Sequence, residues 1–156
     1  MSTVLITHAQ QYAGPGCIDV LLRQHGRLYC HDASFVHLDA RHQFELAHPG
    51  SHALTAQTPD ALADELAARG VPVDSVVHNN VYPNVPYAIE AIPANVMKEA
   101  FDALLMFPMR LTQRLLPAMR AAGNGRMVFV TSARYRQPEH GYAVATSIRN
   151  ATTTFA

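Results

Sequence analysis

The stretch Arg126–Ala156, RMVFVTSARYRQPEHGYAVATSIRNATTTFA, decides the fold of this chain. Met127–Val130 is a short run of large apolar residues, which is typical of a strand buried on both faces in a parallel sheet. The run ends in Thr131 and Ser132, and a helical stretch that carries Arg149 follows after a loop. Because open α/β sheets bind ligands at the carboxyl ends of their strands, we expect Ser132 to lie where such a fold does its chemistry.

Earlier segments of the chain repeat this order of a short apolar strand and then a helix. Strands that alternate with helices at this spacing predict an α/β fold, a Rossmann-like doubly wound parallel sheet with flanking helices in three layers. We expect one such domain over residues 1–156. The expected strands cover residues 3–7, 27–30, 52–55 and 73–78, and the expected helices run between Gly16 and Gly26, Ser34 and Ala47, Thr58 and Arg69, and Asn95 and Ala122.

Capping and breaking residues support several of these helices. Ser34 is a candidate N-cap for the second helix, and Thr58 followed by Pro59 is an N-cap followed by a proline at the first helical position. Pro108 is expected to kink the long helix. The apolar residues of that helix recur at helical spacing, so we expect them to pack against the sheet or a partner subunit.

Composition excludes several classes of protein. The formal net charge is zero over 156 residues, which gives no indication of nucleic acid or an anionic membrane surface as a partner. No window reaches the about 18 consecutive apolar residues of a membrane span, and no signal peptide is recognisable. The two cysteines, Cys17 and Cys30, fit reduced thiols, so we expect a cytoplasmic protein. The spacing of the histidines matches no metal-binding motif, so we predict no metal site.

The C-terminal stretch also resembles a known family. A serine at a strand end, a tyrosine thirteen residues later and a basic residue four after that form the pattern of the short-chain dehydrogenase/reductase superfamily. With arginine in place of lysine, the pattern resembles the halohydrin dehalogenases, a branch of that superfamily that uses no cofactor. Ser132 and Arg149 match the serine and the arginine, whereas the tyrosine position is Ala145.

The first strand-to-helix turn bears on cofactor binding. The reductases carry T-G-x-x-x-G-x-G there, and with Thr7 as the threonine the first two glycines fall on His8 and Tyr12, leaving Gly14 at the third. The side chains of His8 and Tyr12 would block the close backbone approach that a pyrophosphate needs, so we predict no dinucleotide cofactor. The resemblance implies a halide pocket here instead, and a plain surface turn is the alternative. Asp32, where a ribose-binding acid would lie, is then expected to be a cap or turn residue.

The resemblance implies a reaction in which a vicinal halohydrin closes to an epoxide and releases halide, with ring opening by small anions as the reverse. The serine orients the substrate oxygen, while a tyrosine beside the arginine removes its proton. Ala145 cannot do this, and Tyr142, three residues earlier on the predicted helix, is the candidate base; Tyr135 is a weaker one. The expected halide or substrate pocket consists of Tyr12, Tyr82, Asn79 and Arg134.

The resemblance covers the whole chain but only the N-terminal two thirds of a family member, so we expect a sheet that is incomplete at its C-terminal side and a last helix that is cut short. In a full-length form the family implies a homo-oligomer, a dimer or tetramer, with no nucleic-acid or membrane partner. Two alternatives remain open. One is an NAD(P)-dependent short-chain reductase, although Ala103 stands about where reductases place a proton-relaying asparagine. The other is a non-catalytic subunit, which the alanine at position 145 favours.

Overall fold

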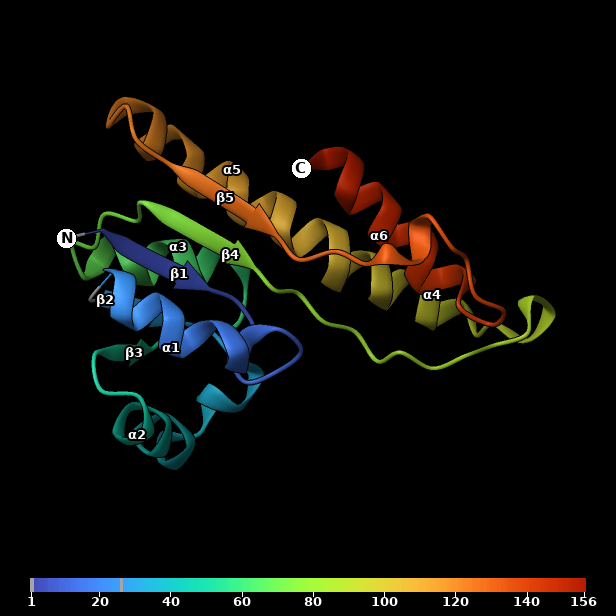
Figure 1. The fold of residues 1–156 in the computed structure, drawn as a ribbon, viewed down its shortest axis with the longest axis horizontal. Coiled ribbons are helices and arrows are strands. Elements are labelled where there is room, and N and C mark those ends of the chain that lie inside the picture. Colours follow the sequence, from blue (N-terminus) through green and yellow to red (C-terminus); the bar gives the residue numbers. More distant parts are fainter. Residues whose placement is uncertain (1, 26) are drawn as a thin grey trace.

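A parallel five-stranded sheet lies at the centre of the molecule, in the order β3-β2-β1-β4-β5 (Figure 1). The computed structural model describes residues 2–25 and 27–156, without the side chain of residue 135. The strands are β1 (Thr3–Ile6), β2 (Arg27–Cys30), β3 (Ser51–Ala53), β4 (Ser75–His78) and β5 (Arg126–Phe129). The α-helices are α1 (Gly14–His25), α2 (Leu38–Ala47), α3 (Pro59–Ala68), α4 (Ala94–Phe101), α5 (Phe107–Ala121) and α6 (Ala143–Phe155).

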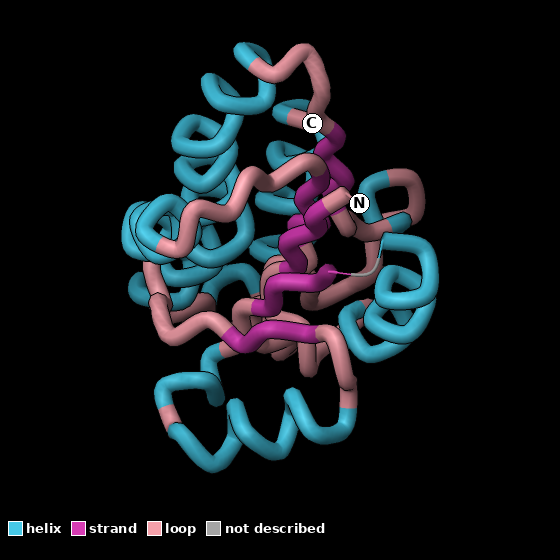
Figure 2. The backbone as a smooth tube through the Cα atoms, turned by 90° about the vertical axis from the view of Figure 1, so that its left-hand side faces the viewer, coloured by secondary structure: helices cyan, strands magenta, loops and turns pink. Residues whose placement is uncertain are grey.

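Alternate residues of the central strands separate the core into two clusters, one on each face of the sheet. In β1, Val4 and Ile6 pack with Ile18 of α1, whereas Leu5 packs with Leu111 of α5. Figure 2 shows helices on both sides of the strands, as these two clusters require. The predicted doubly wound, three-layer α/β fold is therefore confirmed. The predicted helix end at Gly26 lies outside the described residues.

Strand β5 differs from the prediction of a strand buried on both faces. It pairs with β4 at the edge of the described sheet, and its residues are exposed or half-buried in alternation. Val128 in particular leaves 55% of its surface exposed. The apolar run of residues 127–130 predicted the strand correctly, but burial depends on what covers each face, and one face of β5 is open here.

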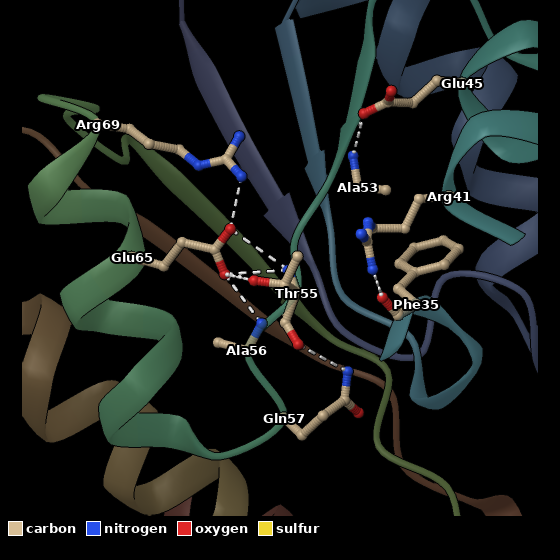
Figure 3. Close-up of polar contacts among 9 residues, drawn as sticks. All are labelled: Phe35, Arg41, Glu45, Ala53, Thr55, Ala56, Gln57, Glu65 and Arg69. Carbon is tan, nitrogen blue, oxygen red and sulfur yellow. Dashed lines mark hydrogen bonds and ion pairs between the residues drawn. The ribbon is translucent and has the colours of Figure 1, made fainter. Parts of the chain in front are cut away.

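Polar side chains fix the loop between β3 and α3 on the sheet (Figure 3). The carboxylate of Glu65 in α3 accepts hydrogen bonds from the backbone amides of Thr55 and Ala56, at 3.0 and 2.9 Å, and pairs with Arg69 at 2.5 Å. The Gln57 amide then donates to the carbonyl of Asp32 after β2 (3.1 Å). These bonds hold the loops at the carboxyl ends of β2 and β3 together.

The helix starts were predicted with mixed success. Thr58 caps α3 as expected, because its Oγ1 accepts from the Ala61 amide at 3.3 Å, and Pro59 follows at the first helical position. Ser34 does not cap α2. Asp32 instead caps a 3-10 turn over Ala33–Val36, because its carboxylate accepts from the Ser34 amide at 3.1 Å. Helix α2 begins only at Leu38, after His37.

The predicted long helix is interrupted by a π turn over Asp102–Met106, which separates α4 from α5 and ends two residues before Pro108. Proline has no amide proton, and its ring clashes with the carbonyl four residues earlier in a regular α-helix. A wider turn relieves this clash, so a π turn at this position has a local cause.

Among the described residues, no helix combines the length and apolarity that crossing a bilayer requires.

Candidate functional site

The carboxyl ends of β1, β4 and β5 lie side by side, at the point where the strand order changes direction. Figure 1 shows the segments that leave β4 and β5 running together toward α4 and α6. Between these segments and the β1–α1 loop lies a cavity of about 310 Å³. Its walls are Gln11 and Tyr12 of that loop, Val81, Tyr82 and Asn84 after β4, Leu104 of the π turn, Ser132 and Arg134 after β5, and Ala145, Thr146 and Arg149 of α6.

The β1–α1 loop has a backbone conformation that usually requires glycine, although residues with side chains occupy the positions concerned. His8 and Tyr12 have φ of 50° and 51°, in the left-handed region that side-chain-bearing residues rarely adopt. These are the two positions at which the reductase motif places glycine. Asn79 holds the loop in this shape: its side-chain amide donates to the carbonyls of His8 (2.9 Å) and Gln11 (2.8 Å).

The imidazole of His8 packs against the rings of His31 and Phe107. Its ring lies edge-on to His31, with centroids 4.9 Å apart, and 5.7 Å from the ring of Phe107. Burial lowers the pKa of both His8 and His31 to about 4, so both rings are neutral at physiological pH. The Nδ1 atom of His8 is buried and finds no hydrogen-bond partner in the described part of the chain. The rings of His8, His31 and Phe107 thus form an aromatic cluster packed beside the loop.

Tyr12 lies on the solvent-exposed side of the same loop. Its phenol donates a hydrogen bond to the carbonyl of Thr131, 3.1 Å away, so the side chain reaches from the β1–α1 loop to the end of β5. The residue as a whole leaves 61% of its surface exposed, and it lines the cavity. A group held in this way lies across the point where the backbone would otherwise be open to a pyrophosphate.

Arg149 is anchored at the strand ends rather than pointing freely into the cavity. Its Nη1 donates to the Val130 carbonyl at 2.7 Å and its Nη2 to the Asn80 carbonyl at 2.9 Å. The guanidinium carbon lies 5.5 Å from the centre of the Tyr12 ring. No carboxylate pairs with Arg149 among the described residues, and burial lowers its pKa, although guanidinium remains charged under ordinary conditions.

Ser132, Ala145 and Thr146 provide the small side chains of the cavity. Ser132 caps a short 3-10 turn, with its Oγ accepting from the Arg134 amide at 3.3 Å, so its hydroxyl proton is available to a ligand. Ala145 lies one helical turn before Arg149 and lines the cavity together with that arginine and Ser132. Thr146, which the sequence reasoning missed, has a buried hydroxyl without a partner in the described residues. Its spacing of three residues from Arg149 on one helix was the available signal.

Tyr142 and Arg134 contact each other. The Arg134 guanidinium lies 4.0 Å from the centre of the Tyr142 ring, pairs with Glu139 at 3.0 Å and donates to Asn84 at 3.0 Å. The charge of Arg134 is therefore already balanced by Glu139. Tyr142 is the N-cap residue of α6 and is not one of the residues that line the cavity. The side chain of Tyr135 lies outside the described part of the structure.

The remaining predicted residues have other surroundings. Tyr82 lines the cavity and donates to Glu99 at 3.1 Å, and partial burial together with that carboxylate raises its pKa. Asn79 lies behind the β1–α1 loop and supports it, without lining the cavity. Asp32 accepts hydrogen bonds from the amides of Gln10 (3.0 Å) and Ser34 (3.1 Å), as a cap would. No cluster of three potential metal ligands occurs among the described residues.

Comparison with known proteins places this geometry among solved structures, although no family model and no curated protein matches the chain. A structure described as a dehalogenation enzyme is 34% identical with a TM-score of 0.91, and the alignment covers 99% of this chain and 63% of that one. A halohydrin dehalogenase bound to ethyl (2S)-oxiran-2-ylacetate is 24% identical with a TM-score of 0.92, covering 99% and 62%. A short-chain dehydrogenase from Streptomyces avermitilis is 22% identical with a TM-score of 0.85, covering 99% and 57%. The chain thus spans less than two thirds of the length of each.

Proposed function

We propose that this chain, which has the fold of the short-chain dehydrogenase/reductase superfamily and resembles its halohydrin dehalogenases, provides the substrate cavity of a halohydrin dehalogenase. The reaction is closure of a vicinal halohydrin to an epoxide with release of halide, and opening of the epoxide by a small anion in reverse. The observation that carries the proposal is that Ser132 and Arg149 line one cavity whose entrance Tyr12 occupies, at a glycine position of the dinucleotide motif.

The chemistry assigns each residue a role. The Ser132 hydroxyl donates to the substrate oxygen and orients it, which contributes positioning rather than proton transfer. A base takes the proton of the substrate hydroxyl while the oxygen forms a bond to the neighbouring carbon, the carbon–halogen bond breaks and the halide departs with the electron pair. A tyrosine at position 145 would be that base, and this chain has alanine there. The positive charge of Arg149 favours the anionic oxygen. A cofactor has no part in this sequence.

The mechanism needs a base that takes the substrate proton, and no residue of the cavity is assigned to this role. A tyrosine at position 145 would lie one helical turn from Arg149, and the guanidinium would lower its pKa from the usual value of about 10. Ala145 has no proton to exchange. Tyr142 is held against Arg134 and is not in the cavity wall, which argues against it as a replacement. We therefore propose that the chain as it stands has weak or no dehalogenase activity.

A non-catalytic subunit of the same fold is the second candidate, and Ala145 is the observation that favours it. A nucleotide-dependent reductase is less well supported, because Tyr12 and the ring cluster of His8 and His31 occupy the space beside the first turn. Addition of the chain to NADH or NADPH is expected to leave the fluorescence of either cofactor unchanged.

The test is halide release from a small vicinal bromohydrin by this chain, by Ala145→Tyr, and by the double variant Ala145→Tyr with Ser132→Ala. The tyrosine variant is expected to release bromide at least about 100-fold faster than the chain itself, the range that a positioned acid–base group supplies. The double variant is expected to lose this gain. Release that survives Ser132→Ala would contradict the assigned role of the serine.

Two outcomes separate the candidates. If Ala145→Tyr releases bromide, the cavity has the geometry of a dehalogenase and lacks only its base. If neither protein releases bromide while both remain folded, the dehalogenase proposal fails and a non-catalytic role is favoured.

A further inference from the structure

We propose that the cavity beside Ala145 binds a small phenol in its anionic form, as a ligand held between Arg149 and the hydroxyl of Ser132. The proposal rests on the proposed function to the extent that both use this cavity. It goes beyond that function because it assigns a ligand class that is neither a halohydrin nor a halide.

The charge of the cavity points to an anion with a single charge. Its charged wall residues are Arg134 and Arg149, and no aspartate or glutamate lines it. Arg134 is neutralised by Glu139 at 3.0 Å, whereas Arg149 has carbonyl and aromatic neighbours and no carboxylate among the described residues. A partly buried positive charge without a partner is costly, so a ligand that supplies one negative charge is favoured.

The hydrogen-bonding groups point to a single anionic oxygen. Both terminal nitrogens of Arg149 already donate to backbone carbonyls, so the guanidinium does not offer the free fork that carboxylates and phosphates use. The Ser132 hydroxyl is a single donor, because its oxygen accepts from the Arg134 amide and its proton has no acceptor among the described residues. A phenolate oxygen can accept from this hydroxyl and lie near the guanidinium.

The walls and the size point to an aromatic ring. Tyr12 and Tyr82 contribute their rings, and Leu104 closes the cavity from the π turn. Aromatic side chains bind a flat ring by stacking or by edge contacts. A volume of about 310 Å³ is at the small end of ligand pockets, which suits a one-ring compound better than a nucleotide.

The test uses p-nitrophenol, whose phenol and phenolate forms differ in colour near neutral pH. The titratable wall residues are Tyr12, Tyr82, Arg134 and Arg149. Because Arg149 is the unpaired charge, saturable binding is expected to lower the pKa of bound p-nitrophenol by about one unit, which equals about a tenfold preference for the phenolate. Unsubstituted phenol is expected to compete, and benzoate is expected to compete less well.

Variants locate the site. Ala145→Leu places a larger side chain in the cavity and is expected to abolish binding, whereas Asn150→Leu, on the exposed side of the same helix, is the matched control and is expected to bind as the original chain does. Arg149→Met is expected to remove the preference for phenolate. Thermal melting of each variant shows whether it is folded, and competition by phenol on the original chain provides a measurement that needs no variant.

The proposal is overturned if p-nitrophenol shows no saturable binding, if binding survives Ala145→Leu, if the pKa of the bound dye is not lowered, or if benzoate binds more tightly than p-nitrophenol. The readout is colour, so it is independent of bromide release. Dye binding without halide release in any variant would contradict the proposed function alone, and halide release without dye binding would contradict the phenolate site alone.

Discussion

Thr152 of α6 has its Oγ1 2.8 Å from the carbonyl oxygen of Leu104 in the π turn and 3.0 Å from that of Ile148 in its own helix, and we assign its one proton to the shorter contact. In a regular α-helix that carbonyl would accept from the amide of residue 108, which is a proline and has none. Both residues are buried, so an unpaired carbonyl would be costly here. The hydroxyl of α6 thus bonds to the backbone group that Pro108 leaves open, and it fixes α6, which carries the cavity residues Ala145 and Arg149, against the π turn.

Replacing Thr152 by valine keeps the shape and removes the donor. The Leu104 carbonyl is then buried without this partner, and we expect the free energy of unfolding to fall by about 1–3 kcal/mol. Urea unfolding measures the change. Thr154→Val is the matched control, because Thr154 is exposed and its hydroxyl bonds to the Asn150 carbonyl of its own helix. Equal losses in the two variants would contradict the role given to Thr152.

The start of α1 provides a second test, on the loop that carries Tyr12. A Cβ built at Gly14 would lie 2.3 Å from the carbonyl oxygen of Ala9, which is a backbone atom and cannot move away alone. Gly14→Ala must therefore displace the loop, and we expect a loss of stability of at least about 2 kcal/mol, as for overpacked cores. The same substitution also displaces Tyr12 from the cavity entrance.

Gly16→Ala is the control for this loop. A Cβ at Gly16 meets nothing within 4 Å, and the residue lies inside α1, where alanine is the better helix former. The variant is expected to be more stable than the original chain by about 0.5–1 kcal/mol. Thermal unfolding of both variants checks the pair, and similar destabilisation by both would show that the contact with Ala9 is not the cause.

The left-handed backbone at Tyr12 gives a third prediction. With φ at 51°, any side chain with a Cβ is disfavoured by about 1–2 kcal/mol, whereas glycine is not. Tyr12→Gly is therefore expected to be more stable than Tyr12→Ala by about 1 kcal/mol, the reverse of the order found within helices and strands. Chemical denaturation of the two variants measures this difference directly. An alanine variant that is the more stable of the two would show that the loop relaxes away from this conformation.

The sequence predicted the sheet and its helices because the strands at β1, β2 and β4 are short apolar runs and the helices between them have ordinary periodicity, with the expected Thr58 cap at α3. It did not predict that β5 is half exposed, since the apolar run at residues 127–130 is the same whether or not a neighbour covers it. It predicted an effect of Pro108, but not that the effect is a π turn, because the width of a turn depends on which neighbour satisfies the freed carbonyl.

The candidate site was predictable where residues follow strands or share a helix face. Ser132, Tyr12 and Arg149 come together because parallel strand ends meet at one edge and α6 packs over them. The surroundings of Tyr142 and Asn79 were not predictable. The first depends on the loop that brings Arg134 and Glu139 to the start of α6, and the second on a side chain that turns inward to bind the β1–α1 loop.

Histidine burial makes stability depend on pH. His78 of β4 is buried, stacks on Phe129 with ring centroids 4.5 Å apart, and has its Nε2 3.2 Å from the Thr112 hydroxyl. Burial lowers its pKa from 6.5 to about 4, and the pKa values of His8 and His31 shift in the same direction. Between pH 6.5 and about pH 4 the unfolded chain binds protons at these histidines that the folded chain does not. The free energy of unfolding therefore falls as the pH decreases from 6.5 toward about 4. Below about pH 4 these histidines cause little further change.

His78→Gln removes one of these three titrating groups and retains a side chain that can hydrogen-bond to Thr112. Each unit of pKa difference corresponds to about 1.4 kcal/mol, so His78 accounts for roughly 3 kcal/mol at the acid end of the window. Urea unfolding at neutral pH and at about pH 5, above the range in which most carboxylates titrate, measures the slope. The variant is expected to lose less stability between the two conditions than the original chain, whatever its stability at neutral pH.

His42→Gln, at an exposed position of α2, is the control and is expected to leave the slope unchanged. An unchanged slope in His78→Gln would mean that the His78 ring is already protonated, or open to water, in the folded protein.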